Sequence, residues 1–298
     1  MKGAHRESTV PASCPICHAH GGQCNKGVHI AGGDIYKCKE CSGYYLSPPK
    51  RVEYTNSEWT SRREKEWQTD IRIAERFAPK ILKYTSAQLG RPVRRVLEIG
   101  CGTAYMGKGF SSLGCEYTGI DVDATSIELA KSKGIEAHCM AIEEICDASS
   151  TIRSGYDLII SSNVFEHLDD PSKAFSNLRH ISNGIIVVIV PNAQGLFTVL
   201  RANRGCSKMI RMTLGSEREV AYSIDGYWHN ISYTKQTLNY LCAKAGIEVL
   251  ALDLISINDP VFGFVQPNPT FLYRMASAVA AIVKMESEII LVGRLKSA

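Results

Sequence analysis

The sequence lacks the features of a membrane or exported protein. Its 298 residues contain no run of about 18 apolar residues, the length that spans a bilayer. The best candidate, residues 275–285, is shorter and is expected to form a core or interface helix. The N-terminal segment MKGAHRESTV has no apolar core of the kind that a secretory signal requires. We therefore expect a cytoplasmic protein without a membrane span.

A strong charge of either sign is also lacking. The formal charge is +4, and the excess lies in the first 65 residues, which carry ten Lys/Arg and six Asp/Glu. The rest of the chain is neutral. A protein that binds the nucleic-acid backbone usually has a stronger basic field. We therefore do not expect a nucleic-acid partner. The oligomeric state is left open, with a homodimer as one alternative.

Cysteine is plentiful, with eleven residues, and without an export signal these predict thiols and metal ligands rather than disulfides. Two CxxC pairs, Cys14/Cys17 and Cys38/Cys41, lie twenty residues apart. Two such turns complete a closed tetrahedral shell around zinc, which leaves no position for substrate. The spacing therefore predicts structural Zn²⁺, with unmetallated thiols or a redox pair as the alternatives. Four other residues could replace one ligand, but their spacing is less regular: Cys24, His18, His20 and His29.

The N-terminal region predicts a small metal-stabilised module followed by a helix. Residues 33–49, GDIYKCKECSGYYLSPP, indicate a strand, a CxxC turn, a strand and a proline stop, which is the pattern of a zinc ribbon over residues 1–49. Such a small module depends on its metal for stability. Residues 50–90 have an apolar stripe at helical spacing, with Pro79 placed where it could kink or split the helix.

The remaining residues, 91–298, alternate between strand and helix patterns. This alternation predicts an α/β fold with a doubly wound sheet, covered by helices on both faces, whose ligands bind beyond the carboxyl ends of the strands. A sixth strand and an antiparallel seventh strand are expected at 245–256 and 287–295. The other predicted strands are 94–100, 115–121, 134–140, 156–162 and 184–191, and the predicted helices are 103–113, 124–133, 143–148 and 171–181.

The stretch VLEIGCGTAYMG, residues 96–107, joins an apolar strand to a helix through Gly100 and Gly102. Glycine at these positions permits a tight turn and a close approach of the backbone to a ligand. A dinucleotide-binding fingerprint would need a third glycine, which this stretch lacks. The carboxylate of Glu98 would also repel a pyrophosphate, so the segment favours a cationic ligand.

Three motifs now stand in order: VLEIGCGTA, GIDVD and YDLIISSNVFEHLDDP. Together they resemble the signature motifs of class I S-adenosylmethionine (SAM)-dependent methyltransferases, over residues 94–191. Ala104 stands where that family often has a third glycine, and alanine is small enough to be tolerated. The resemblance implies the Rossmann-like methyltransferase fold, whose sheet has seven strands with the last one antiparallel.

For the methionine part of SAM, the resemblance implies contacts from the first and third motifs. The backbone of Gly100, Cys101 and Gly102 would line the methionine. Glu98 would organise the loop and face the ligand's ammonium through water. Asn163, which follows the fourth strand, would bring its backbone close to the same part of the cofactor.

For the nucleoside part, the resemblance implies that Asp121 accepts hydrogen bonds from both ribose hydroxyls. Val122 would pack on the adenine, and Ala141 and Ile142 would flank the ring. Ordinary core packing is the alternative for these three apolar residues.

Methyl transfer needs the acceptor to be positioned and, for an O–H, N–H or C–H acceptor, a proton to be removed. Two histidines are catalytic candidates, since their titration near neutral pH suits a base. His167 lies just past the fourth strand, and His229 lies in GYWHNISYT, which resembles a segment of zinc-ribbon relatives. Structural roles for both, such as loop capping by His167, remain open.

Residues 192–228 form a long connection on the acceptor side. Four basic residues recur there at helical spacing, either as a clamp for an anionic acceptor or as a solvated surface. They are Arg201, Arg204, Lys208 and Arg211.

A zinc ribbon followed by this fold resembles bacterial methyltransferases of sugar and polysaccharide biosynthesis, which implies a sugar, nucleotide-linked sugar, glycan or similar polar acceptor. The C-methylating branch has a longer C-terminal domain, so a hydroxyl or an amine is expected as the acceptor group. Two alternatives stay open. An rRNA base methyltransferase also pairs a zinc finger with this fold, and a catalytically inactive partner protein could bind SAM without turnover.

Overall fold

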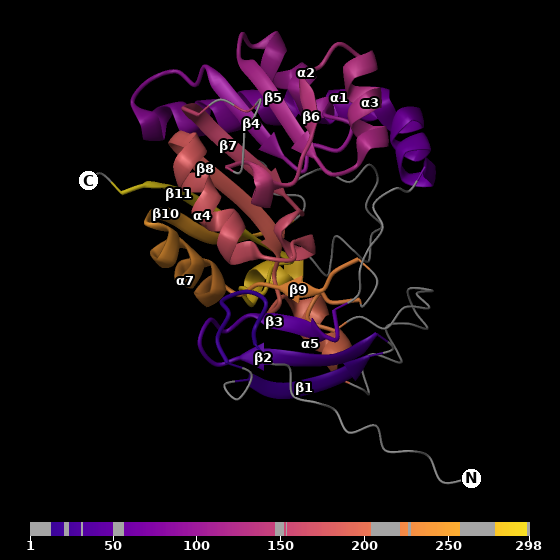
Figure 1. Cartoon of the computed structure of the whole chain (residues 1–298), viewed down its shortest axis with the longest axis vertical. Helices are drawn as coiled ribbons and strands as arrows, with labels where there is room; N and C mark the ends of the chain where they lie inside the picture. Colours follow the sequence, from indigo (N-terminus) through magenta and orange to yellow (C-terminus); the bar gives the residue numbers. More distant parts are fainter. Residues whose placement is uncertain are drawn as a thin grey trace.

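The computed structural model describes residues 13–20, 24–30, 32–49, 57–146, 152, 154–203, 221–225, 228–256 and 278–296. Within them lie a seven-stranded sheet in the order β10-β11-β8-β7-β4-β5-β6 and a four-stranded sheet in the order β1-β2-β3-β9. Figure 1 shows the small sheet at one end of the molecule, beside the end of the large sheet where β9 and α5 lie. No helix in the described part of the chain combines the length and apolarity that crossing a bilayer requires.

The large sheet confirms the predicted α/β fold. Its strands are β4 (Arg95–Ile99), β5 (Glu116–Asp121), β6 (Ala137–Cys139), β7 (Tyr156–Ser162), β8 (Ser182–Pro191), β10 (Ile247–Ile255) and β11 (Glu288–Leu295). Strands β4 to β8 pair in parallel, whereas β11 pairs antiparallel with both β8 and β10. The apolar, β-branched runs of β7 and β8 are buried on both faces, as a sheet covered by helices requires.

Helices cover both faces of this sheet. One face packs against α1 (Ser57–Leu89), α2 (Tyr105–Ser112) and α3 (Ala124–Ser132), and the other against α4 (Pro171–Ile181) and α7 (Lys235–Ala245) (Figure 1). The short helix predicted near 143–148 is a 3₁₀ turn, Ile142–Glu144, and α5 (Leu196–Ala202) begins the long connection after β8. Residues 278–282 are helical, within the stretch where the sequence predicted a helix.

Helix α1 runs through Pro79 without a break. The proline is exposed, and so is Glu75, whose carbonyl loses its usual amide partner. Because Glu75 lies on the exposed side of the helix, water can bond to its carbonyl and the helix can continue. The buried side of α1, which includes Ala74, Phe77 and Ile81, packs on the core and confirms the predicted apolar stripe.

The small sheet contains more of the chain than the predicted ribbon. Besides β2 (Gly33–Cys38) and β3 (Tyr44–Ser47), it includes β1 (Cys24–Ile30), which the sequence analysis missed, and β9 (Ile231–Ser232). Strand β9 pairs antiparallel with β3, and Leu46 N–H donates to Asn230 C=O at 2.8 Å. A segment from beyond residue 228 is therefore part of the small sheet. The division into 1–49, 50–90 and 91–298 stays a prediction.

Candidate active site

The turn after β4 is held open by backbone geometry and by Asp121. Gly100, Gly102 and Ala104 have φ values of 71°, 52° and 56°. Such left-handed conformations cost a non-glycine residue roughly 1–2 kcal/mol, which makes Ala104 the strained member of the three. At Gly100 a Cβ would lie 2.1 Å from Val164 Cγ2, whereas at Gly102 it would meet nothing within 4 Å. The turn therefore packs on the segment after β7 at its first glycine and is open at its second.

Asp121, the last residue of β5, ties this turn to the next one. Its two carboxylate oxygens accept hydrogen bonds from the amides of Gly102 at 2.8 Å and Asp123 at 2.9 Å. Burial raises the pKa of Asp121, an effect that these two amides partly oppose. Each oxygen has a second lone pair, so the carboxylate can still accept two hydroxyl groups from a ligand.

Glu98 lies beneath the same turn. Its side chain remains partly accessible, although burial and the nearby Asp121 raise its pKa to about 8. The hydroxyl of Tyr117 donates a hydrogen bond to its carboxylate. Glu98 is therefore mainly protonated at pH 7 without a ligand. If a cation binds beside it, Glu98 would ionise and its negative charge would stabilise the cation. Cys101, by contrast, is buried against Gly119 and offers only its backbone to a ligand.

The predicted adenine contacts divide into exposed and buried residues. Val122 is 49% exposed, so its side chain is accessible to a ligand. Ala141 is half-buried and lies close by, because Met140 N–H donates to Asp121 C=O at 2.9 Å. Ile142 is 3% exposed and packs in the core, so its side chain follows the packing alternative. Asn163 is exposed, with a φ of 55°, directly after β7.

The two candidate catalytic histidines come together across 61 intervening residues. Their ring centroids are 4.8 Å apart at an interplanar angle of 69°. His167 Nδ1 bonds the carbonyl of Trp228 at 2.8 Å, and His229 Nδ1 bonds that of Ser223 at 2.8 Å. Burial and the neighbouring His229 lower the pKa of His167 to about 4, so His167 is neutral at pH 7.

A third titratable residue, Glu166, lies beside this pair and was missed by the sequence analysis. It is fully buried, and burial holds its pKa well above the ordinary range. Its Oε1 lies 4.0 Å from His167 Nε2. The available signal was a charged residue in an apolar segment directly after a buried strand. The hydroxyl of Tyr233 donates to Phe165 C=O at 2.7 Å and so links this turn to the chain after β9.

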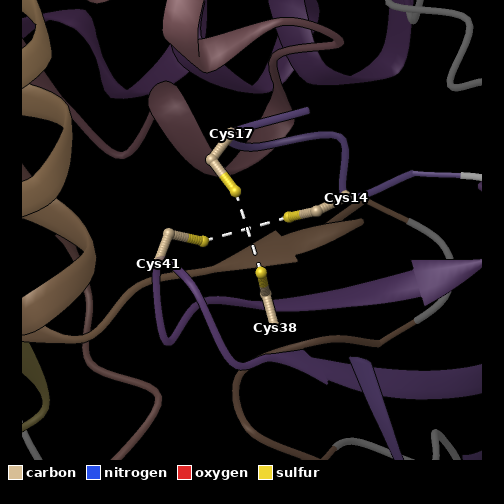
Figure 2. A group of neighbouring side chains, drawn as sticks. All are labelled: Cys14, Cys17, Cys38 and Cys41. Carbon is tan, nitrogen blue, oxygen red and sulfur yellow. Dashed lines mark hydrogen bonds between the residues drawn. The ribbon is translucent and has the colours of Figure 1, made fainter. Parts of the chain in front are cut away.

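The four predicted zinc ligands converge on one point, as Figure 2 shows. Their sulfur atoms lie within 4.8 Å of one another, with Cys14–Cys41 at 3.9 Å and Cys17–Cys38 at 3.7 Å. Tetrahedral bonds of about 2.3 Å to zinc would place sulfurs roughly 3.8 Å apart, so the cluster fits Zn²⁺. His18 and His29 contact Asp170 and Asp34 instead.

The predicted acceptor clamp consists of four basic residues in the connection after β8. Arg204, Lys208 and Arg211 lie outside the described residues, as does the side chain of Arg201. The clamp stays a prediction.

Comparison with known proteins gives the following matches. The profile of a methyltransferase domain family (Methyltransf_23) matches residues 66–252. A ubiquinone biosynthesis O-methyltransferase from Rhodopseudomonas palustris (strain HaA2) is 32% identical over 106 residues, which are 33% of this chain and 40% of that protein. Another from Idiomarina loihiensis is 22% identical over 179 residues, 58% of this chain and 68% of that protein. The chain thus spans about two fifths of the first of these relatives.

Solved structures with a similar fold include the plantazolicin methyltransferase BpumL in complex with S-adenosylhomocysteine (SAH). It has a TM-score of 0.51 and 17% identity, over 80% of this chain and 90% of that one. A SAM-dependent methyltransferase from Clostridium acetobutylicum has a TM-score of 0.51 and 12% identity, over 80% and 98% of the two chains. At these identities the likeness shows the fold alone.

Proposed function

The chain belongs to the family of SAM-dependent methyltransferases, and from this premise we propose that it methylates a hydroxyl or an amine of a polar small molecule. The observation that carries the proposal is the meeting of His167 and His229 at 4.8 Å between ring centroids. They lie just past β7 and just before β9, on the side of the sheet where the carboxyl ends of the parallel strands open. We take this pair as the acceptor side of the site.

The cofactor side is proposed at the turn after β4. Bound SAM supplies a methyl group on a positively charged sulfur, which is a good leaving group. Asp121 would hold the ribose, Val122 and Ala141 the adenine, and the backbone at Gly100, Gly102 and Asn163 the methionine. Glu98 would ionise beside the ligand's ammonium. Because Gly100 contacts Val164, three residues before His167, the two sides share one turn.

On the acceptor side, the histidines would orient the acceptor and help to remove its proton. Each Nδ1 is engaged by a carbonyl, which fixes the ring orientation and leaves the lone pair of the neutral ring at Nε2. The two imidazoles therefore offer hydrogen-bond acceptors to an O–H or N–H group. The cysteine cluster would hold Zn²⁺ in a closed shell and supply structure only.

We favour oxygen as the acceptor atom. An activity screen is needed to identify the class of acceptor molecule. The relatives described above are named O-methyltransferases, which supports a hydroxyl. A sugar or a nucleotide-linked sugar is proposed on the resemblance to zinc-ribbon methyltransferases, although the names of these relatives point to ubiquinone biosynthesis instead. Phenolic acceptors therefore belong in the same test.

The test is a SAM-dependent activity screen on nucleotide-linked sugars, glycans and phenols, with mass detection of one added CH₂ unit. The matched pair is His229→Gln, which should lose turnover, and His180→Gln on the exposed face of α4, which should keep it. Turnover of phenols without sugars would replace the sugar proposal. Methylation of RNA in preference to both would favour the rRNA alternative. SAM binding with no turnover on any class would favour a non-catalytic partner.

A further inference from the structure

Three side chains with metal-binding atoms meet at the acceptor side: Glu166, His167 and His229. One ligand atom from each lies within 4.8 Å of the other two. Two histidines and one carboxylate, with positions left open, form a ligand set that catalytic metal sites use. This group shares no residue with the cysteine cluster.

The hydrogen bonds of both rings engage Nδ1 and leave Nε2 as the nitrogen that could bind a metal. A carbonyl oxygen only accepts, so the Nδ1 atoms bonded to Trp228 C=O and Ser223 C=O must carry the hydrogens. In a neutral ring the lone pair is then at Nε2. Histidines that bind metals are commonly held in this way, with the other ring N–H donating to a carbonyl or a carboxylate. In His167 this nitrogen also lies near the carboxylate, with Nε2 4.0 Å from Glu166 Oε1.

Glu166 supplies a second, independent observation. It is 0% exposed, and neither carboxylate oxygen meets a hydrogen-bond donor of another residue in the described part of the chain. A buried, ionised carboxylate without partners is costly, and a bound cation compensates its charge. A second carboxyl group, that of Glu288, interacts electrostatically with Glu166. A second acidic group makes the surroundings more favourable to a cation.

We propose that Glu166, His167 and His229 bind a divalent transition-metal ion whose open positions take the acceptor oxygen. Nitrogen and oxygen ligands suit Zn²⁺, Co²⁺, Fe²⁺ or Mn²⁺. The binding of the ion stands on its own, whereas its part in the reaction rests on the proposed methyl transfer. There, the imidazole lone pairs would bind the ion instead of the acceptor O–H, and the ion would lower the pKa of the bound hydroxyl, whose O–H bond breaks with release of the proton to water. The oxygen then forms a bond to the methyl carbon while the carbon–sulfur bond breaks, which leaves neutral SAH.

The experiment titrates Co²⁺ into this 298-residue chain with the metal at its cysteines retained. Calorimetry counts the ions, and visible absorption reports their ligands. We expect one further Co²⁺ per chain, with bands of nitrogen and oxygen ligation and no sulfur charge transfer. Glu166→Gln and His229→Gln should weaken this binding by more than the ~10–100-fold that substitution of a supporting residue costs. Glu128→Gln and His180→Gln, on exposed helix faces, are the matched controls and should bind as the wild type does.

Absence of a second ion in the wild type, or unchanged binding in the two cluster variants, would overturn the proposal. If Glu166→Gln does not fold, His229→Gln decides, because His229 is partly exposed and its loss opens no deep cavity. Measurement of turnover separates the binding of the ion from its part in the reaction. A bound ion with no methyl transfer would count against the proposed function and leave the ion site intact. Full turnover with the second site emptied would overturn the ion's part in the reaction.

Discussion

The cofactor side and the acceptor side of this site are built in different ways. Most of the cofactor side comes from one β-α-β unit, in which Gly100, Gly102 and Asp121 are joined by backbone amides over about twenty residues. The acceptor side is assembled from distant parts of the chain. His167 follows β7, His229 precedes β9, and β9 is held by β3, which follows the cysteine cluster. Local hydrogen bonds thus maintain one side, and long-range packing maintains the other.

This difference makes the two sides separable. Leu46 N–H donates to Asn230 C=O, directly after His229, and Tyr45 pairs with Ile231. Disturbing the cysteine cluster should therefore reach His229 through β3 and β9. The route to Asp121 is longer, because it runs from Tyr233 to Phe165 and then through the contact of Val164 with Gly100.

The largest effect is expected from Cys38→Ser. Loss of one of four ligands should release the metal and destabilise the small sheet, because such modules depend on their ion. Methyl transfer should fall by about 100-fold or more, as misplacement of a catalytic group by about 1 Å suffices for such a loss. SAH affinity should stay within about threefold of the wild type, because the proposed cofactor contacts at the turn after β4 and at Asp121 lie far from the cysteines in the sequence. Metal analysis, turnover and SAH calorimetry measure the three quantities.

Cys24→Ser is the matched control, since Cys24 lies in the same sheet but outside the cluster of four. It should keep both metal and turnover. If Cys38→Ser abolished SAH binding while acceptor affinity held, the assignment of the small sheet to the acceptor side would be wrong.

Two glycine variants test the packing of the turn on the cofactor side. Gly100→Ala adds a Cβ 2.1 Å from Val164 Cγ2 in a left-handed conformation and should cost about 2–5 kcal/mol of unfolding free energy. Gly102→Ala has open space and should cost only about 1 kcal/mol. If that space is where the methionine lies, Gly102→Ala should nonetheless weaken SAH binding. Denaturant unfolding and calorimetry check both, and equal stability losses would contradict the difference in packing.

A more local change is Asp121→Asn. It keeps an oxygen for the backbone but loses the charge that would hold two ribose hydroxyls. Hydrogen bonds to a charged group contribute about 1.5–3 kcal/mol, so SAH affinity should fall by about 10–100-fold. Glu116→Gln, at the exposed opposite end of β5, should leave SAH binding unchanged. Calorimetric affinity within twofold of the wild type for Asp121→Asn would remove this residue from the cofactor site.

The smallest effect concerns protonation of Glu98. Its pKa of about 8 is raised above the unfolded value, so its contribution to stability is present at low pH and is lost as pH rises through about 8. Binding of the cationic ligand should reverse this preference and release up to one proton per SAM bound at pH 7. Calorimetry in buffers of different ionisation enthalpy measures the release. Glu98→Gln should abolish it, and an unchanged release in that variant would contradict the assignment.

The same local and long-range division explains what the sequence could predict. The glycine turn, the strands around it and Asp121 follow from residue types at short spacing, and so do the two CxxC turns. The pairing of β9 with β3 does not, because a two-residue strand carries no pattern of its own and is fixed by tertiary contacts. The continuity of α1 through Pro79 likewise depends on which side of the helix faces water.

For the acceptor side, the sequence could predict individual residues but not their arrangement. His167 and His229 each stood out by position, but their meeting, and the burial of Glu166 beside them, arise from packing between β7, β9 and the small sheet. Ile142 shows the converse, since its place after a strand end suggested a ligand contact and the fold buried it in the core.

The most direct test of the central claim measures SAH affinity and methyl transfer together in the double variant His167→Gln/His229→Gln. We expect an SAH dissociation constant within about threefold of the wild type and a turnover reduced by about 10²-fold or more. Turnover close to that of the wild type, or loss of both properties in parallel, would contradict a cofactor side that is separate from a catalytic histidine pair.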